Sequence, residues 1–147
     1  MNAIILFAFY FLGGVTPTPN TAWKTSFDEA KAEAAVSHKY ILLSFSGSDW
    51  CIPCIKMEET MFDHPSFKNF AADKLVLVKA DFPRMKKNQL PADQKKKNDL
   101  LAEKFNPNGV FPLTIILSPT GKKIYSIEGY PKGTVTQFIN SLEEVIK

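Results

Sequence analysis

The sequence predicts one α/β domain, built as a mixed central sheet with helices on both faces. Apolar runs of strand length alternate with segments whose apolar residues recur at helical spacing, which gives one helix followed by the order β-α-β-α-β-β-α. The 147 residues, 45% hydrophobic and 22% charged, suffice for one globular domain and are too few for two. Disorder and coiled coil are therefore excluded.

The first 21 residues are expected to lie outside this domain. Residues 3–15 are almost wholly apolar, with the length of a signal-peptide core and short of the ~18 residues that span a bilayer. We interpret 1–21 as a signal peptide or targeting segment with its linker, and 22–147 as the folded domain. The protein is thus expected to be exported, to a periplasm. No basic residue precedes the apolar run, so an uncleaved membrane anchor is the alternative.

The first helix and strand follow this linker. Ser26 and Glu29 form a capping-box signature, which predicts a helix over residues 26–37. The apolar run 40–46 (YILLSFS) ends at Gly47 and is typical of a buried strand. A second run, 74–81 (KLVLVKAD), predicts a parallel strand beside it.

A helix is expected between these strands. Cys54, Met57 and Met61 recur at i, i+3 and i+7, so the two cysteines, Cys51 and Cys54, open this helix. The stretch 83–98 is interpreted as a solvated insertion before a short helix over 99–105.

The net positive charge of the chain comes from this insertion. It holds six basic residues and one acid, while the rest of the chain carries 12 basic and 14 acidic residues. Contact with an acidic partner is the alternative to simple solvation. No nucleic-acid-binding face is indicated.

The C-terminal third predicts a hairpin and a closing helix. Residues 111–117 form a strand entered through Pro112, at a position where the missing N–H is tolerated. A turn at 118–121 leads into an antiparallel strand over 122–128. Apolar residues at helical spacing follow, at Val135, Phe138, Ile139, Leu142, Val145 and Ile146.

The Cys-x-x-Cys pair carries the predicted chemistry. Backbone N–H groups and the helix dipole at a helix start favour the thiolate, which is the form that attacks a disulfide. Cys51 is therefore the predicted nucleophile, and Cys54 resolves the mixed disulfide. With only two cysteines, a disulfide-stapled framework and a four-cysteine zinc site are excluded. The weaker alternatives are a structural disulfide, a metal site completed by His38 and His64, and two chance core cysteines.

The motif Trp50-Cys51-Ile52-Pro53-Cys54, the proline of 109–112 (GVFP) and the strand-turn-strand-helix that follows resemble the thioredoxin-fold thiol:disulfide oxidoreductases, from about residue 22 to the end. The resemblance implies a thioredoxin fold and a cis Phe111–Pro112 bond. It also implies that the backbone of Phe111, at Pro112, hydrogen-bonds an extended peptide. Trp50, next to the nucleophile, is interpreted as an apolar lip for substrate, with a core residue as the alternative. No cofactor or metal is expected, because the dithiol is itself the redox carrier.

The segments FSGSDWC and MEETMF are similar to exported bacterial thioredoxin-like proteins, including the C-terminal domain of transmembrane thiol:disulfide interchange reductases. This likeness implies a protein disulfide reductase with protein disulfide or dithiol substrates and an upstream redox partner. A disulfide oxidase or isomerase, and a binding module that does not use its cysteines, are the alternatives.

One departure from the family concerns proton transfer. Cytosolic thioredoxins carry a buried aspartate on the strand before the motif, and an alignment with a one-residue insertion at Gly47 places Ser44 there in this sequence. Asp49 and Glu58 are substitute carboxylates, with neither favoured. Lys79 matches a lysine of the family and is interpreted as a strand-end charge that reaches solvent.

Overall fold

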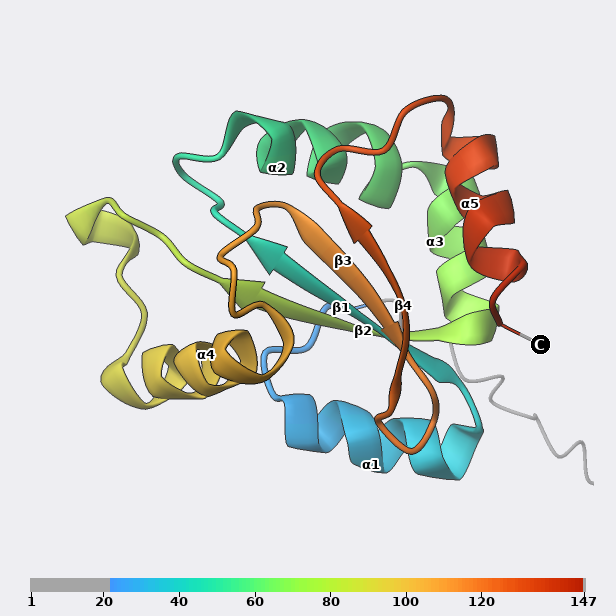
Figure 1. Cartoon of the computed structure of the whole chain (residues 1–147), viewed down its shortest axis with the longest axis horizontal. Helices are drawn as coiled ribbons and strands as arrows, with labels where there is room; N and C mark the ends of the chain where they lie inside the picture. Colours follow the sequence, from blue (N-terminus) through green and yellow to red (C-terminus); the bar gives the residue numbers. More distant parts are fainter. Residues whose placement is uncertain (1–21, 147) are drawn as a thin grey trace, which may run out of the picture.

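A computed structural model describes residues 22–146, which form a four-stranded mixed sheet in the order β2-β1-β3-β4 (Figure 1). The strands are β1 (Tyr40–Ser46), β2 (Leu75–Asp81), β3 (Leu113–Leu117) and β4 (Lys123–Glu128). β1 runs parallel to β2 and antiparallel to β3, and β4 is antiparallel to β3. The predicted mixed sheet is confirmed.

Helices cover both faces of this sheet, as predicted. α1 (Phe27–Ser37) and α4 (Ala92–Phe105) lie on one face, and α2 (Ile52–Met57), α3 (Pro65–Lys74) and α5 (Val135–Glu143) lie on the other (Figure 1). Successive side chains of a strand point to opposite faces, so β1 contributes to two cores. The core under α1 and α4 includes Ala30, Ala34, Ile41, Leu43, Phe45, Leu101 and Phe105. The core under the other helices includes Leu42, Met57, Met61, Phe67, Ile116 and Phe138.

The first helix begins where the capping signal predicts. The Ser26 hydroxyl accepts a hydrogen bond from the N–H of Glu29 at 3.3 Å. His38 ends the helix in the left-handed conformation, with φ of 58°. This histidine is therefore a helix-ending residue.

The connection from β1 to β2 contains a helix that the sequence pattern did not predict. α2 continues into a π-helical segment, η1 (Glu58–Phe62), and α3 follows it. His64 caps α3, because its Nδ1 accepts from the N–H of Ser66 at 3.2 Å. The buried residues of this helix are Phe67 and Ala71. Their spacing of four residues is the helical pattern from which this helix could have been predicted.

Helix α4 is longer than predicted. α4 begins at Ala92 rather than at residue 99, so only residues 83–91 of the expected insertion connect β2 to it, with a short 3-10 turn, η2 (Lys86–Asn88). The buried side of α4 continues upstream through Asn98, which is 2% exposed and donates to the carbonyl of Asp81 at 2.9 Å. Because the buried residue at this position is polar, the pattern of apolar residues stops at residue 101. The helix was therefore predicted too short.

Within residues 22–146, no helix has both the length and the apolar character needed to cross a bilayer. The segment 1–21, expected to be a targeting segment, lies outside the described residues.

Candidate active site

Cys51 and Cys54 form a disulfide at the start of α2. Cys51 is the N-cap residue, and its Sγ accepts from the N–H of Cys54 at 3.3 Å. Its own N–H donates to the carbonyl of Gly47 at 2.9 Å, which closes the turn after β1. The two cysteines are 5% and 4% exposed. The predicted pair is therefore an oxidised dithiol at a strand-to-helix junction.

The indole of Trp50 is fixed on three sides. Its Nε1 donates to the carbonyl of Phe82 at 2.7 Å, and its ring packs edge-on against Phe111 with centroids 5.4 Å apart. A side chain on Gly47 would overlap the indole, so glycine is required at that position. Trp50 thus forms a rigid aromatic wall directly before Cys51.

Phe111 and Pro112 precede β3, which begins at Leu113 rather than at residue 111. The peptide bond that joins them is cis. The half-buried ring of Phe111 lies between Trp50 and Phe82, with centroid distances of 5.4 and 5.5 Å. The structure thus brings Trp50 and Phe111 into contact, and Pro112, which is buried, follows in the chain.

A carboxylate lies near Cys54. Glu58 follows Cys54 by four residues, and its Oε2 accepts from the Nζ of Lys79 at 2.6 Å. Both side chains line a pocket of about 230 Å³ together with Cys54. Lys79 also lies over the ring of Trp23, 4.5 Å from its centroid, and only 23% of its side chain is exposed. The interpretation of Lys79 as a charge that reaches solvent was therefore wrong.

Ser44 is buried on β1 and is the register partner of Lys79 on β2. Its side chain supplies no carboxylate. Glu58 reaches Lys79 from the helix side instead. Glu58 was one of the two carboxylates that the sequence offered as substitutes for the missing aspartate. Its contact with Lys79 depends on the pairing of β1 with β2 and on the packing of α2.

Asp49, the other candidate carboxylate, serves a different purpose. It accepts from the N–H groups of Arg84 and Met85 at 2.9 and 3.0 Å and from Nδ2 of Asn88 at 2.9 Å. The N–H of Arg84 and then the Asn88 amide lower the pKa of Asp49. Its contribution to holding this segment is therefore present above its unfolded-state pKa and is lost as the pH falls through the lower folded-state value.

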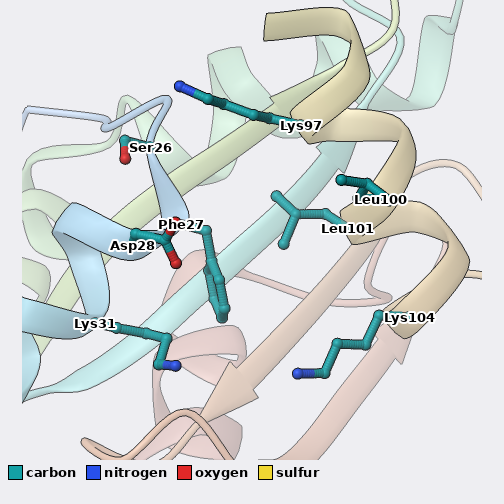
Figure 2. Close-up of a pocket in the computed structure, with 8 residues that line it drawn as sticks. All are labelled: Ser26, Phe27, Asp28, Lys31, Lys97, Leu100, Leu101 and Lys104. Atoms are coloured by element: carbon teal, nitrogen blue, oxygen red, sulfur yellow. The ribbon is translucent and has the colours of Figure 1, made fainter. Parts of the chain in front are cut away.

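Another pocket lies between α1 and α4, away from the disulfide (Figure 2). It measures about 270 Å³ and is lined by the apolar side chains of Phe27, Leu100 and Leu101, with lysines at its rim. Neither cysteine lines it. Across the described part of the chain, no cluster of three His, Cys, Asp or Glu side chains could hold a metal ion. The redox-capable group in this part is the disulfide itself.

Known proteins resemble this chain in sequence and in fold. A family model described as thioredoxin-like matches residues 22–119. The disulfide bond reductase DsbH of Chlamydia pneumoniae is 34% identical over 128 residues, which cover 87% of this chain and 74% of DsbH. A solved DsbH oxidoreductase structure has a TM-score of 0.77 at 32% identity, over 85% of this chain and 83% of that one.

The oxidised C-terminal domain of DsbD from Neisseria meningitidis has a TM-score of 0.56 at 17% identity. The alignment covers 84% of this chain and 99% of that domain, and the likeness is one of fold. The fold and family that the sequence resemblance implied are thus confirmed. The chain belongs to the thioredoxin-like family, and it is a homologue of DsbH whose Cys-x-x-Cys pair forms the disulfide of a thiol:disulfide oxidoreductase.

Proposed function

We propose that this protein reduces disulfides of exported proteins, with Cys51 as the nucleophile and Cys54 as the resolving cysteine. The observation that carries the proposal is the Cys51–Cys54 disulfide at the start of α2, beside the aromatic wall of Trp50 and Phe111. The name of the 34% identical relative, a disulfide bond reductase, supports the reducing direction. The apolar segment 3–15 supports export.

The reaction is an exchange of sulfur–sulfur bonds. The thiolate of reduced Cys51 attacks a substrate disulfide, a mixed disulfide forms, and the other substrate sulfur leaves as a thiolate that takes up a proton. The Cys54 thiolate then attacks Sγ of Cys51, which releases the second substrate sulfur and forms the disulfide seen in the structure. Two electrons pass to the substrate. An upstream dithiol protein must return two electrons to the Cys51–Cys54 pair.

The first turn of α2 supports Cys51 as the attacking residue. The N–H of Cys54 that donates to Cys51 Sγ would stabilise a thiolate on the same atom. Cys54 is the third residue of α2, and its own N–H is the group that donates to Cys51 Sγ. The two sulfurs therefore have different electrostatic surroundings, which suits one for attack and the other for resolution.

Glu58 is the proposed proton acceptor for Cys54. The resolving thiol must lose its proton before it attacks, and Glu58 lines the same pocket. The pocket volume of about 230 Å³ exceeds the ~30 Å³ of one water molecule, so water can relay the proton between the two side chains. The ion pair with Lys79 holds the carboxylate at this position.

Trp50, Phe111 and Pro112 form the proposed peptide-binding lip. The two rings make an apolar surface beside Cys51, and the backbone of Phe111 lies just before the paired residues of β3. An extended substrate segment would add its backbone hydrogen bonds there, in the manner of strand addition. Aromatic contact of this kind is tolerant of substrate sequence.

Trapping the mixed disulfide tests the proposal. Cys54→Ser removes the resolving thiol, so the variant is expected to accumulate covalent adducts with disulfide-containing proteins of an oxidising extract. Non-reducing electrophoresis before and after addition of a thiol measures these adducts. Cys51→Ser is the matched control, and it is expected to form none.

Adducts on Cys51→Ser rather than on Cys54→Ser would reverse the assignment of the two cysteines. If neither variant forms adducts, and partner binding survives replacement of both cysteines by alanine, the protein is a binding module and the proposal is wrong.

A further inference from the structure

Residues 82–88, here called the basic arm, are fastened to the two residues that precede Cys51. Trp50 Nε1 donates to the carbonyl of Phe82, and the Asp49 carboxylate accepts three hydrogen bonds from the arm at 2.9 to 3.0 Å. Figure 1 shows the arm projecting beyond the end of the sheet at which β2 stops, before α4 begins. The arm is thus a fixed neighbour of the disulfide rather than a detached surface loop.

The guanidinium of Arg84 lies against Trp50. Its Cζ is 3.6 Å from the centroid of the ring, the distance of a stacked cation–π contact. Stacking occupies the flat face of a guanidinium and leaves the N–H donors at its edge available. Among residues 22–146, no carboxylate pairs with this group. A cation with uncommitted donors therefore lies on the residue adjacent to the nucleophile.

The rest of the arm adds charge and apolar surface. Lys86 and Lys87 are exposed, and neither forms an ion pair within the described part of the chain. Met85 is 49% exposed, and Ile52, which directly follows Cys51, is 73% exposed. The arm contains three basic residues and no acid, so by itself it accounts for the formal net charge of +3. Three positive charges with no acidic residue among them therefore lie beside the redox centre.

We propose that the basic arm selects protein disulfides whose reacting cysteine is flanked by aspartate or glutamate. This inference rests on the proposed function and specifies the substrate class. Arginine binds carboxylates through paired N–H donors, and a local positive field speeds the encounter with an acidic segment. Ile52 and Met85 supply apolar contact for the neighbouring residues of the same segment.

Reduction of two matched peptides tests the proposal. Each peptide contains one intramolecular disulfide, flanked by glutamates in one peptide and by glutamines in the other. The measured quantity is the second-order rate constant with the reduced full-length protein. We expect the acidic peptide to react about tenfold faster at an ionic strength of about 0.01 M. The ratio should approach one at about 1 M, where the screening length falls to about 3 Å.

Two double variants locate the effect. Arg84→Gln with Lys86→Gln removes two charges from the arm, and the rate ratio at low ionic strength is expected to fall below about twofold. Lys122→Gln with Lys123→Gln is the matched control, because it removes two exposed charges near the turn between β3 and β4. This control is expected to keep the ratio of about tenfold.

Equal rate constants for both peptides in the unaltered protein would overturn the inference and leave the proposed reductase intact. A preference that the control variant loses as fully as the arm variant would overturn it as well. Inhibition by a short single-stranded oligonucleotide, without a preference between the peptides, would assign the arm to nucleic acid instead. If the unaltered protein reduces neither peptide, the proposed function itself fails, and this inference fails with it.

Discussion

Among single residues, Glu58 is the one proposed to accept the proton of Cys54. Its carboxylate lies on Lys79 and shares a pocket with Cys54, while the strand position opposite Lys79 holds Ser44. Glu58→Gln is expected to slow the decay of the mixed disulfide about tenfold. This is below the ~10²–10⁴ of a general base, because the carboxylate is 33% exposed and water can partly replace it. Acid-quenched single-turnover kinetics measure formation and decay separately.

Asp63→Asn is the matched control, since Asp63 ends the same helical segment and, among residues 22–146, forms an ion pair only with the exposed Lys68, at 3.0 Å. It is expected to leave the decay unchanged. The assignment of Glu58 is wrong if its variant slows formation and decay by the same factor, because that pattern indicates a structural role.

α4 shows at the scale of an element how one polar residue joins a helix to the sheet. Asn98 is buried among the residues that face the core, donates to the carbonyl of Asp81 and accepts from Gln94 at 2.9 Å. Asn98→Ala leaves that carbonyl without its partner, which is expected to lower the free energy of unfolding by about 1–3 kcal/mol. Urea denaturation followed by circular dichroism measures this change.

Lys97→Ala, at the exposed neighbouring position, is expected to change the same quantity by no more than about 0.5 kcal/mol. Equal effects of the two substitutions would mean that the hydrogen bond from Asn98 to β2 does not stabilise the fold.

The reduction potential belongs to the whole molecule, because it reports the free-energy difference between the folded oxidised and reduced forms. For a reductase, we expect a value near that of thioredoxin, about −270 mV. Equilibration with defined glutathione buffers, followed by quantification of the Cys51–Cys54 disulfide, measures it. A value near −120 mV would instead identify a donor of disulfides and reverse the proposed direction.

Features that depend on neighbouring residues could be predicted from the sequence. Strand runs, the Ser26 cap, the Cys-x-x-Cys at a helix start and the proline before β3 are local patterns, and periodicity or turn chemistry reveals them. α4 was predicted too short, because the buried Asn98 interrupts the apolar period on which such a prediction depends.

Which distant residues meet at the site depends on how the strands pair and the helices pack. Glu58 and Lys79 are 21 positions apart, Asp49 and Arg84 are 35 apart, and no local pattern encodes either pairing. The parallel pairing of β1 with β2 brings the segments after the two strands, which contain Asp49 and Arg84, to the same end of the sheet. Lys79 lies within β2, and Glu58 reaches it from the helical segment that follows α2. The sequence therefore determined the reacting sulfurs, and the packing of the sheet decided which charges surround them.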